Sequence, residues 1–413
     1  MRRLHTAVHE LTIRNRQVGF AEWSQRHYDF VCPSSVTYPF QWFWDSCFHA
    51  IALAHVDVER AESEITSLLA NQHDDGFVSH IALWQRDRYE ESVAAYAIAL
   101  RNRWLTDEMQ PPLLAEAIAV VAERGRGRAF LDEVLPAAVR FYDWLAAVRD
   151  PDGDGLIAIL RPDETGLDHS PKFQELLGAQ SLDDWTDAWY RLAAAYDAVD
   201  RRPEAMIELD RFVVEDVMVN TIYIENQRVL ADLLDRIDRG DEAERFRDRA
   251  ALATRSLLDK CWDAERGLFF DLAGADERWL ETNTITCLFP LLLADLDDER
   301  AGRLIAHLSD PAEYWTRYPV PSVAINEASF APDELPGKEV WRGPTWLNAN
   351  WYLVRGLRRH ERDDLAAVIV ERSLELIETH GFREYYNPFT GTPGGAPDFS
   401  WSAVMIDAAE GAS

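Results

Sequence analysis

The chain has 413 residues and a formal net charge of −30, from 72 acidic and 42 basic side chains. Such a surface repels nucleic acids and anionic membranes, which excludes most proteins that bind either one. A hydrophobic content of 47% is ample for a packed core and excludes a disordered chain. The acidic excess predicts a salt-adapted protein, because at 1 M salt the repulsion between exposed charges is screened over about 3 Å.

The N-terminal segment, the length of the apolar runs and the cysteine spacing predict a cytoplasmic protein. The first residues, MRRLHTAVHELTIRNRQ, carry charges without an apolar stretch, and no apolar run approaches the length of a membrane span. The four cysteines, Cys32, Cys47, Cys261 and Cys287, show no CxxC spacing and are expected to be reduced. No linker or low-complexity tract divides the chain, so we expect residues 1–413 to form a single domain. The sequence does not determine the oligomeric state, and a homo-oligomer is among the alternatives.

Apolar residues recur at three- and four-residue steps in a dozen segments, which predicts an all-α fold. In chain order the predicted helices are 44–55, 58–71, 91–105, 112–123, 130–148, 186–199, 212–239, 242–261, 298–308, 346–358, 365–379 and 400–409. Irregular stretches at 32–41, 71–84, 150–174, 314–344 and 381–399 separate some of them, and long loops in compact domains are usually functional. Alternating short and long loops favour a toroid of helical hairpins with the long loops at one mouth, although a solenoid or two bundles would give a similar pattern.

Two loop carboxylates are the candidate catalytic groups. Asp168 lies in the segment ETGLDHSPKF, and Glu384 lies in FREYYNPFTG. One acid that donates a proton and one carboxylate that activates water are the minimum requirement for cutting a glycosidic bond. Asp168 has a structural alternative, an Asx turn with the backbone near Ser170. Lys172 is also close in sequence, and its charge would hold Asp168 ionised.

Aromatic clusters outside helical spacing are candidate sugar-binding segments. Trp and Tyr faces stack on sugar rings, while Asp and Gln side chains bond hydroxyl groups. The candidates are Tyr38, Gln41, Trp42, Trp44 and Asp45 in one segment, Trp341, Arg342, Gly343 and Trp346 in a second, and Tyr385 and Trp401 near the end of the chain. The alternative for the first segment is a helix start whose aromatic side chains fill the core, but a carboxylate among three bulky aromatics is costly to bury unless something binds it.

The remaining polar motifs give weaker signals. The loop QHDDGFVSH offers Gln72 and His80 as substrate-facing groups, but its histidines fit no zinc spacing. Gln110 precedes two prolines that open a helix. The Asp150–Gly155 segment resembles a calcium loop, yet Arg161 stands where an EF-hand needs its bidentate acid, so we favour a tight Asp/Gly turn and keep a calcium site as the alternative. With no phosphate-binding loop, dinucleotide fingerprint or nucleophile elbow, we predict neither a metal nor a cofactor.

Taken together, five segments resemble glycoside hydrolase family 63, especially its compact bacterial members that hydrolyse glucosylglycerate and mannosylglycerate. The matching pieces are Tyr38-Pro with Trp42 and Trp44-Asp45, Gln110-Pro-Pro112, Gly166-Leu-Asp168-His-Ser-Pro171, Trp341-Arg-Gly-Pro344 with Trp346, and Glu384-Tyr-Tyr through Ser400-Trp401. The resemblance implies an (α/α)6 barrel and metal-independent, inverting hydrolysis of α-linked glucose or mannose. It further implies that Asp168 is the general acid, Glu384 the general base, and that Tyr38, Trp42, Trp44, Asp45, His80, Gln110, Trp341 and Trp346 wall the sugar pocket.

The chain departs from this family pattern on the side of the leaving group. Lys172-Phe173 stands where the compact hydrolases usually have Arg-Trp, Asp398-Phe399 replaces polar residues, and the stretch after Phe173 is short. These changes predict a retained sugar subsite and an altered aglycone subsite. Alternative functions are a trehalase or a glucosidase for short α-glucans, and, outside enzymes, a sugar-binding protein on the same fold. Sugar epimerases use similar toroids, but the loop histidines here form no convincing acid–base pair.

Overall fold

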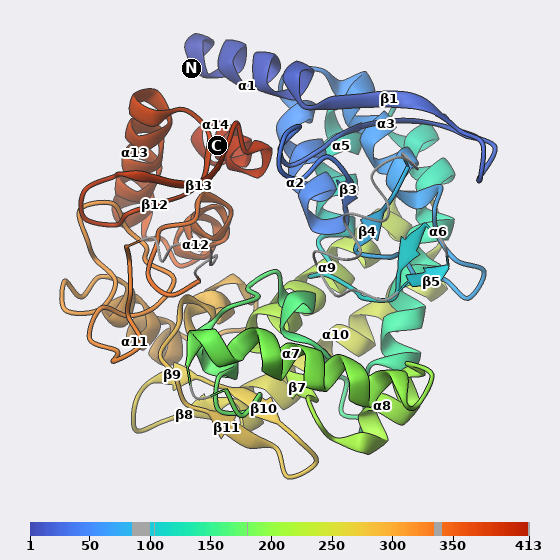
Figure 1. Cartoon of the computed structure of the whole chain (residues 1–413). Helices are drawn as coiled ribbons and strands as arrows, with labels where there is room; N and C mark the ends of the chain where they lie inside the picture. Colours follow the sequence, from blue (N-terminus) through green and yellow to red (C-terminus); the bar gives the residue numbers. More distant parts are fainter. Residues whose placement is uncertain (85–99, 103, 180, 334–340, 412–413) are drawn as a thin grey trace.

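Helices make up most of the computed structural model, which describes residues 1–84, 100–102, 104–179, 181–333 and 341–411 (Figure 1). The α-helices are α1 (Arg2–Arg14), α2 (Phe43–Ala54), α3 (Val58–Leu69), α5 (Leu114–Arg124), α6 (Arg128–Val148), α7 (Leu182–Asp197), α8 (Pro203–Leu209), α9 (Val217–Asp235), α10 (Gly240–Lys260), α11 (Asp298–Leu308), α12 (Leu347–Arg359), α13 (Asp363–His380) and α14 (Met405–Glu410). Short 3-10 helices include η2 (Pro162–Thr165), η3 (Pro171–Phe173), η4 (Ile285–Leu292) and η5 (Ser400–Val404). The prediction that the protein is rich in helices is confirmed.

The innermost elements contact one another in a closed sequence. α2 packs on α5, α5 on α9, α9 on η4, η4 on α12, α12 on η5 and η5 back on α2. Every residue of α2 and of η4 is buried. A helix that is hydrophobic on all sides must be covered on all sides. The other long helices supply that cover.

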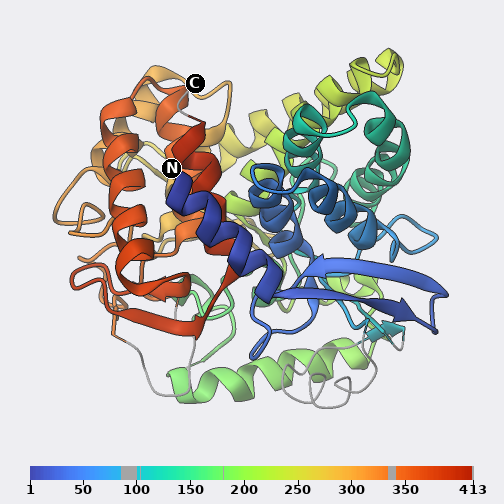
Figure 2. The ribbon, with the colours of Figure 1, turned by 90° about the horizontal axis from the view of Figure 1, so that it is seen from above.

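The outer helices are amphipathic and lie outside this ring. α1 packs on α2, α3 on α2 and α5, α6 on α5, α10 on α9, α11 on η4 and α13 on α12. Figure 2 shows that α7 and the red strands of the last hairpin lie along one face, whereas the turn between α9 and α10 reaches the opposite face. The two faces therefore receive opposite ends of the inner helices.

Small antiparallel sheets decorate the helical ring, and the all-α prediction did not include them. The pairs are β1 (Arg16–Ala21) with β2 (Arg26–Val31), β8 (Trp262–Asp263) with β9 (Leu268–Phe269), and β12 (Arg383–Tyr386) with β13 (Pro393–Pro397). β7 (Val214–Glu215), β10 (Asp271–Ala273) and β11 (Arg278–Leu280) form three strands, while β3 (Gln41–Trp42), β4 (Ile81–Ala82), β6 (Leu105–Thr106) and β5 (Leu100–Asn102) form four. None is long enough to compete with the helices for the core.

Most predicted helices are confirmed, with end positions shifted by a few residues. The exceptions have physical reasons. The last part of the predicted helix 91–105 pairs as β5 and β6, and residues 91–99 lie outside the described part of the chain. The predicted helix 212–239 begins with β7 because Asp216 caps α9 at Val219. The stretch 381–399 is a hairpin and not an irregular loop, and α1, α8 and η4 were not predicted.

Two further expectations concern cysteines and membranes. All four cysteines are free and buried, as predicted for reduced thiols. Within the described residues, no helix combines the length and the low polarity that spanning a membrane requires.

Candidate active site

The N-terminal ends of the inner helices gather several of the predicted site residues on one face of the ring. Trp42 is the N-cap of α2, and Trp346 is the N-cap of α12. Gln110 comes shortly before α5, and Trp401 lies in η5. Helix N-termini present backbone N–H groups and the positive end of the helix dipole, so this face suits ligands rich in oxygen.

Glu384 is buried on strand β12 and is held by its hairpin. Its Oε2 accepts a hydrogen bond of 2.8 Å from the backbone N–H of Ala396 on β13, and its Oε1 lies 3.5 Å from the hydroxyl of Tyr38. Gly395 has a φ of +63°, and a Cβ there would come within 2.4 Å of Oε2. Only glycine fits both this backbone conformation and this close approach. The hairpin that the sequence did not predict therefore positions the carboxylate.

Nine aromatic side chains, which we call the aromatic cluster, form a connected set of ring contacts that reaches this carboxylate through the Tyr38 hydroxyl. They are Tyr38, Trp42, Trp44, His80, Trp341, Trp346, Tyr385, Phe399 and Trp401. Trp341 and Trp346 stack face to face, with ring centroids 3.7 Å apart and planes 8° apart. Trp401 contacts both of them and donates a hydrogen bond of 3.4 Å to the carbonyl of Glu384. Segments separated by more than 300 residues thus meet in one place.

The loop that carries Asp168 packs against the same cluster. Gly166 has a φ of +71°, and a Cβ there would lie 2.5 Å from the Trp44 ring, so the backbone itself covers that ring. The N–H of Ser170 donates to the carbonyl of Leu167, which closes a turn around the half-buried Asp168. Contacts therefore run from this loop through Trp44 and Trp401 to the Glu384 backbone.

The structure assigns Lys172 a different role from the one considered above. Its ammonium group donates to Asp216 at 2.5 Å and lies 2.8 Å from Asp271, and Thr286 is within 3.2 Å. Burial lowers the pKa of Lys172, but the two carboxylates outweigh it and raise the pKa above its ordinary value. The Lys172 ammonium group thus pairs with two carboxylates of the core.

Asp45 is a buried carboxylate in the first turn of α2. It is 3% exposed, and its Oδ1 has no hydrogen-bond partner among the described residues. Burial raises the pKa of Asp45 to about 7, against the lowering effect of His49 nearby. Beside it, Gln110 accepts a hydrogen bond of 3.1 Å from the backbone N–H of Trp44. A buried carboxylate oxygen without a partner is costly, which suits a group kept for a ligand.

His80 belongs to a buried ionic group that the sequence did not indicate. Its Nδ1 is 2.8 Å from the Thr106 hydroxyl, and its Nε2 is 3.8 Å from Glu108. Burial lowers the pKa of His80 to about 4, so its imidazole is neutral at pH 7. Arg161 lies between Glu108 at 2.9 Å and Asp163 at 3.2 Å. Only spatial proximity identifies this group, because its members come from three separate segments.

Arg342 reaches the Asp168 loop from the second aromatic segment. It donates to Oε1 of Gln174 at 3.0 Å, and its guanidinium lies 5.6 Å from the Trp185 ring. Burial lowers the pKa of Arg342 to about 10. The neighbouring Gly343 has a φ of +145° and packs against Phe330, so it shapes the turn.

Gln41 and Gln72 bond elsewhere in the molecule. Gln41 is fully buried, accepts from the Trp84 indole at 2.7 Å and donates to the carbonyl of Glu64. Gln72 donates to the carbonyls of Gly76 and Ala137 at 2.8 Å each. These amides brace the loop after α3, and no described interaction links Gln72 to the aromatic cluster.

The Asp150–Gly155 segment forms the tight turn that was expected. Asp150 accepts from the N–H groups of Gly153 and Gly155. Lys260 places its ammonium group 3.2 Å from Asp152 and 2.8 Å from Asp154. The Lys260 ammonium group therefore neutralises part of the negative charge of this turn.

Solved structures of glycoside hydrolases share this fold. The chain superposes on a GH63 mannosylglycerate hydrolase from Thermus thermophilus in complex with glucose, with a TM-score of 0.82, 30% identity, and coverage of 98% of this chain and 99% of that one. Neutral trehalase Nth1 from Saccharomyces cerevisiae shares the fold, with a TM-score of 0.64 at 15% identity over 98% of this chain and 79% of that one. The protein is a glycosidase.

Sequence comparisons identify the family. Residues 38–402 match the model of the mannosylglycerate hydrolase MGH1-like glycoside hydrolase domain, and the chain belongs to that family. It is 30% identical to a mannosylglycerate hydrolase of Rubrobacter radiotolerans, over 97% of this chain and 96% of the relative. It is also 30% identical to a glucosylglycerate hydrolase of Mycolicibacterium hassiacum, over 89% and 91% of the two chains.

Proposed function

We propose that the protein is an inverting, exo-acting α-glycosidase that releases glucose or mannose from a small α-glucoside or α-mannoside. The observation that carries the proposal is the position of Glu384, buried in an aromatic cluster that is connected by contacts to the Asp168 loop. Aromatic faces and hydrogen-bonding carboxylates together are the chemistry of sugar recognition. Candidate substrates are glucosylglycerate and mannosylglycerate, on which relatives are named to act.

The architecture we propose is one catalytic domain with an (α/α)6 barrel. The closed ring of α2, α5, α9, η4, α12 and η5–α14 supplies the inner layer, and α1, α3, α6, α10, α11 and α13 supply the outer layer. Inner and outer elements alternate along most of the chain, as helical hairpins require. One continuous cluster of buried apolar residues, from Val8 to Ala408, supports a single domain.

In the proposed mechanism Asp168 is the general acid and Glu384 the general base. Asp168 donates its proton to the departing oxygen, and Glu384 takes a proton from a water that attacks the opposite face of the anomeric carbon. Inversion needs roughly 6.5–9.5 Å between the two carboxyl groups, so that water fits beside the base. The Ala396 N–H stabilises the ionised form of Glu384, since a bond to the charged form favours it.

The sugar ring would bind between the aromatic cluster and Asp45. Trp341 stacked on Trp346 offers one apolar wall, and neutral His80 beside Trp42 offers a polar one. Substrate hydroxyl groups would supply the partners that Oδ1 of Asp45 lacks among the described residues. Arg342 and Gln174, beside the Asp168 loop, stand where the aglycone would leave.

Two substitutions test the assignment of the catalytic pair. Asp168→Asn and Glu384→Gln should each lower kcat by at least about 100-fold while leaving the unfolding transition in place. Glu371→Gln, which changes an exposed carboxylate on α13, is the matched control and should keep full activity. Full activity in either site variant would refute the pairing. Proton NMR of the first-formed sugar should show the β-anomer, and an α-anomer would contradict inversion.

A substrate panel separates this proposal from its alternative, a trehalase-like or short α-glucan glucosidase. Purified protein is assayed with glucosylglycerate, mannosylglycerate, trehalose, kojibiose and maltose under identical conditions. A kcat/KM at least about tenfold higher for a glycerate glycoside supports the first function. A preference for trehalose or maltose would favour the alternative, for which the shared trehalase fold is the supporting observation. Binding without turnover of any of them would indicate the sugar-binding protein, a result at odds with the glycosidase relatives.

A further inference from the structure

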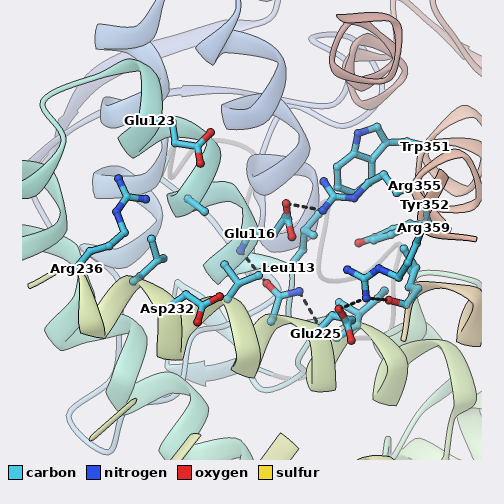
Figure 3. A pocket seen from close by; sticks show the side chains of 16 residues that line it. Leu113, Glu116, Glu123, Glu225, Asp232, Arg236, Trp351, Tyr352, Arg355 and Arg359 are labelled. Carbon is cyan, nitrogen blue, oxygen red and sulfur yellow. Dashed lines mark hydrogen bonds and ion pairs between the residues drawn. The ribbon is translucent and has the colours of Figure 1, made fainter. Parts of the chain in front are cut away.

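A second cavity of about 290 Å³ opens among the inner helices away from the candidate active site (Figure 3). On α9 and α12 its walls run from the middle of the helix towards the C-terminal end, and on α5 they run along the whole helix, from the N-cap Leu113 to Glu123. Residues of the candidate active site lie at or just before the N-terminal ends of α5 and α12. Arg128 pairs with Asp238 at 2.7 Å, which ties the α5–α6 turn to the α9–α10 turn on this face. The parts of its wall on α9 and α12 therefore lie towards the other end of the ring.

The floor of the cavity is aromatic and holds one unused polar group. Trp351 and Tyr352 are both buried, and the Tyr352 hydroxyl has no hydrogen-bond partner among the described residues. Figure 3 shows this hydroxyl directed towards the cavity. Buried hydroxyl groups are almost always hydrogen-bonded, so whatever fills the cavity is expected to supply the partner.

The walls carry charges that are neutralised in pairs. Arg355 is 2.7 Å from Glu116, and Arg359 is 2.7 Å from Glu225, as the dashed lines in Figure 3 mark. Arg355 also covers the Trp351 ring, 4.6 Å from its centroid. Paired carboxylates and guanidinium groups keep spare lone pairs and N–H donors, so together they can bond both sides of a hydroxyl group.

The balance of charge at the rim disfavours anions. The cavity is lined by the acids Glu116, Glu123, Glu225 and Asp232 and by the bases Arg236, Arg355 and Arg359, four against three. The converging helix C-termini add the negative ends of their dipoles. An uncharged ligand avoids this field, and the volume, at the lower end of ligand sites, suits a molecule no larger than a monosaccharide.

We propose that this cavity is a second binding site, distinct from the active site, for a neutral polyhydroxylated molecule of monosaccharide size. The Tyr352 hydroxyl and the two ion pairs, Arg355–Glu116 and Arg359–Glu225, recognise its hydroxyl groups. Because α5, α9 and α12 all contribute, occupancy ties three elements of the inner ring together. Binding does not depend on the proposed glycosidase substrate.

The test follows the Tyr352 ring directly by fluorine NMR of the full chain labelled with 3-fluorotyrosine. The resonance that disappears in Tyr352→Phe is assigned to Tyr352, and the one that disappears in Tyr190→Phe is assigned to the exposed Tyr190 of α7, the matched control. D-glucose and glycerol are the neutral probes, and D-glycerate is the anionic one. We expect a saturable shift of the Tyr352 resonance with at least one neutral probe, no shift at Tyr190, and a response to D-glycerate at least about tenfold weaker.

A wall variant then tests recognition without changing the floor. Glu225→Gln should weaken the neutral probe at this site at least about tenfold and leave hydrolysis within about twofold of wild type. A Tyr352 resonance that does not move with either neutral probe would overturn the proposal, as would equal affinity in Glu225→Gln or a stronger response to D-glycerate. Hydrolytic activity is measured separately, so failure of the proposed glycosidase reaction would be recognised independently of this result.

Discussion

Two buried carboxylates at the starts of inner helices have opposite surroundings. At the start of α9, Asp216 accepts from the Lys172 ammonium group at 2.5 Å and from the Val219 N–H at 2.9 Å. In the first turn of α2, Asp45 keeps one oxygen without a partner among the described residues, and its pKa is raised to about 7. An aspartate at a helix start is thus fully paired in the fold at Asp216, whereas Asp45 keeps an oxygen available to bind a ligand. Satisfied polar groups mark structure, and unsatisfied ones mark candidate function.

The largest predicted change in stability comes from removing the Lys172 ammonium group that pairs with Asp216. Lys172→Met leaves Asp216 and Asp271 buried without their counter-ion and should lower the free energy of unfolding by about 3–5 kcal/mol. Urea unfolding followed by circular dichroism measures it. Lys260→Met, which removes a partly exposed ammonium group from the Asp152–Asp154 turn, is the control and should cost about 1 kcal/mol or less. Equal losses in the two variants would contradict the distinction.

At Asp45 we expect a substitution to raise the free energy of unfolding above pH 7, where the substitution of Lys172 lowers it. Its folded pKa of about 7 lies above the ordinary 3.8, so the folded state binds more protons than the unfolded state between these values, and stability falls as pH rises through that window. Asp45→Asn removes this fall. The variant should match wild type at pH 4 and be more stable by roughly 3–4 kcal/mol at pH 8, while its activity drops about 100-fold. The exposed Asp74→Asn is the control, and a variant less stable than wild type at pH 8 would disprove the assignment.

A smaller effect, on substrate binding, should follow from removing one ring of the Trp341–Trp346 stack. Trp341→Ala removes one member of the stacked pair with Trp346, a contact worth about 0.5–1.5 kcal/mol beyond its buried area. We expect KM to rise about tenfold and kcat to change little, measured by initial rates on the preferred substrate. Trp262→Ala, under the arginines of α11, should leave KM unchanged. A loss confined to kcat would place Trp341 away from the sugar.

The smallest effect concerns the acidic surface. Raising NaCl from about 0.05 to about 1 M should increase the unfolding temperature by a few degrees, because salt screens the repulsion among exposed carboxylates. The stability lost in Lys172→Met should stay the same at both salt concentrations, since a buried pair is screened far less. An unfolding temperature that does not respond to salt would remove the argument for salt adaptation.

The fold was largely predictable because its helices obey one strong periodic signal. α3, α6, α10 and α11 follow the predicted segments within a few residues. The misses have weak or absent signals. The apolar run of η4 contains a proline and no polar face, and the hairpin of β12 and β13 is held by contacts to Glu384 and not by alternation of apolar residues.

The candidate site was predictable in its residue types but not in its connections. Trp44, Trp346 and Trp401 meet as expected from their unusual segments. Lys172 pairs with Asp216 and Asp271, which lie far along the chain in other elements, so its sequence proximity to Asp168 was a poor guide. Glu108 and Asp163, on either side of Arg161, lie in no recognisable motif, so only tertiary packing reveals them.

Gly395 sets a practical limit on how this protein can be re-engineered. Any side chain there would strain a backbone at φ +63° and displace the oxygen that Ala396 holds. Mutant libraries that aim to change the accepted leaving group should therefore keep the β12–β13 hairpin constant and place their diversity at 174–179. That stretch follows the Asp168 loop and includes Gln174, which bonds Arg342.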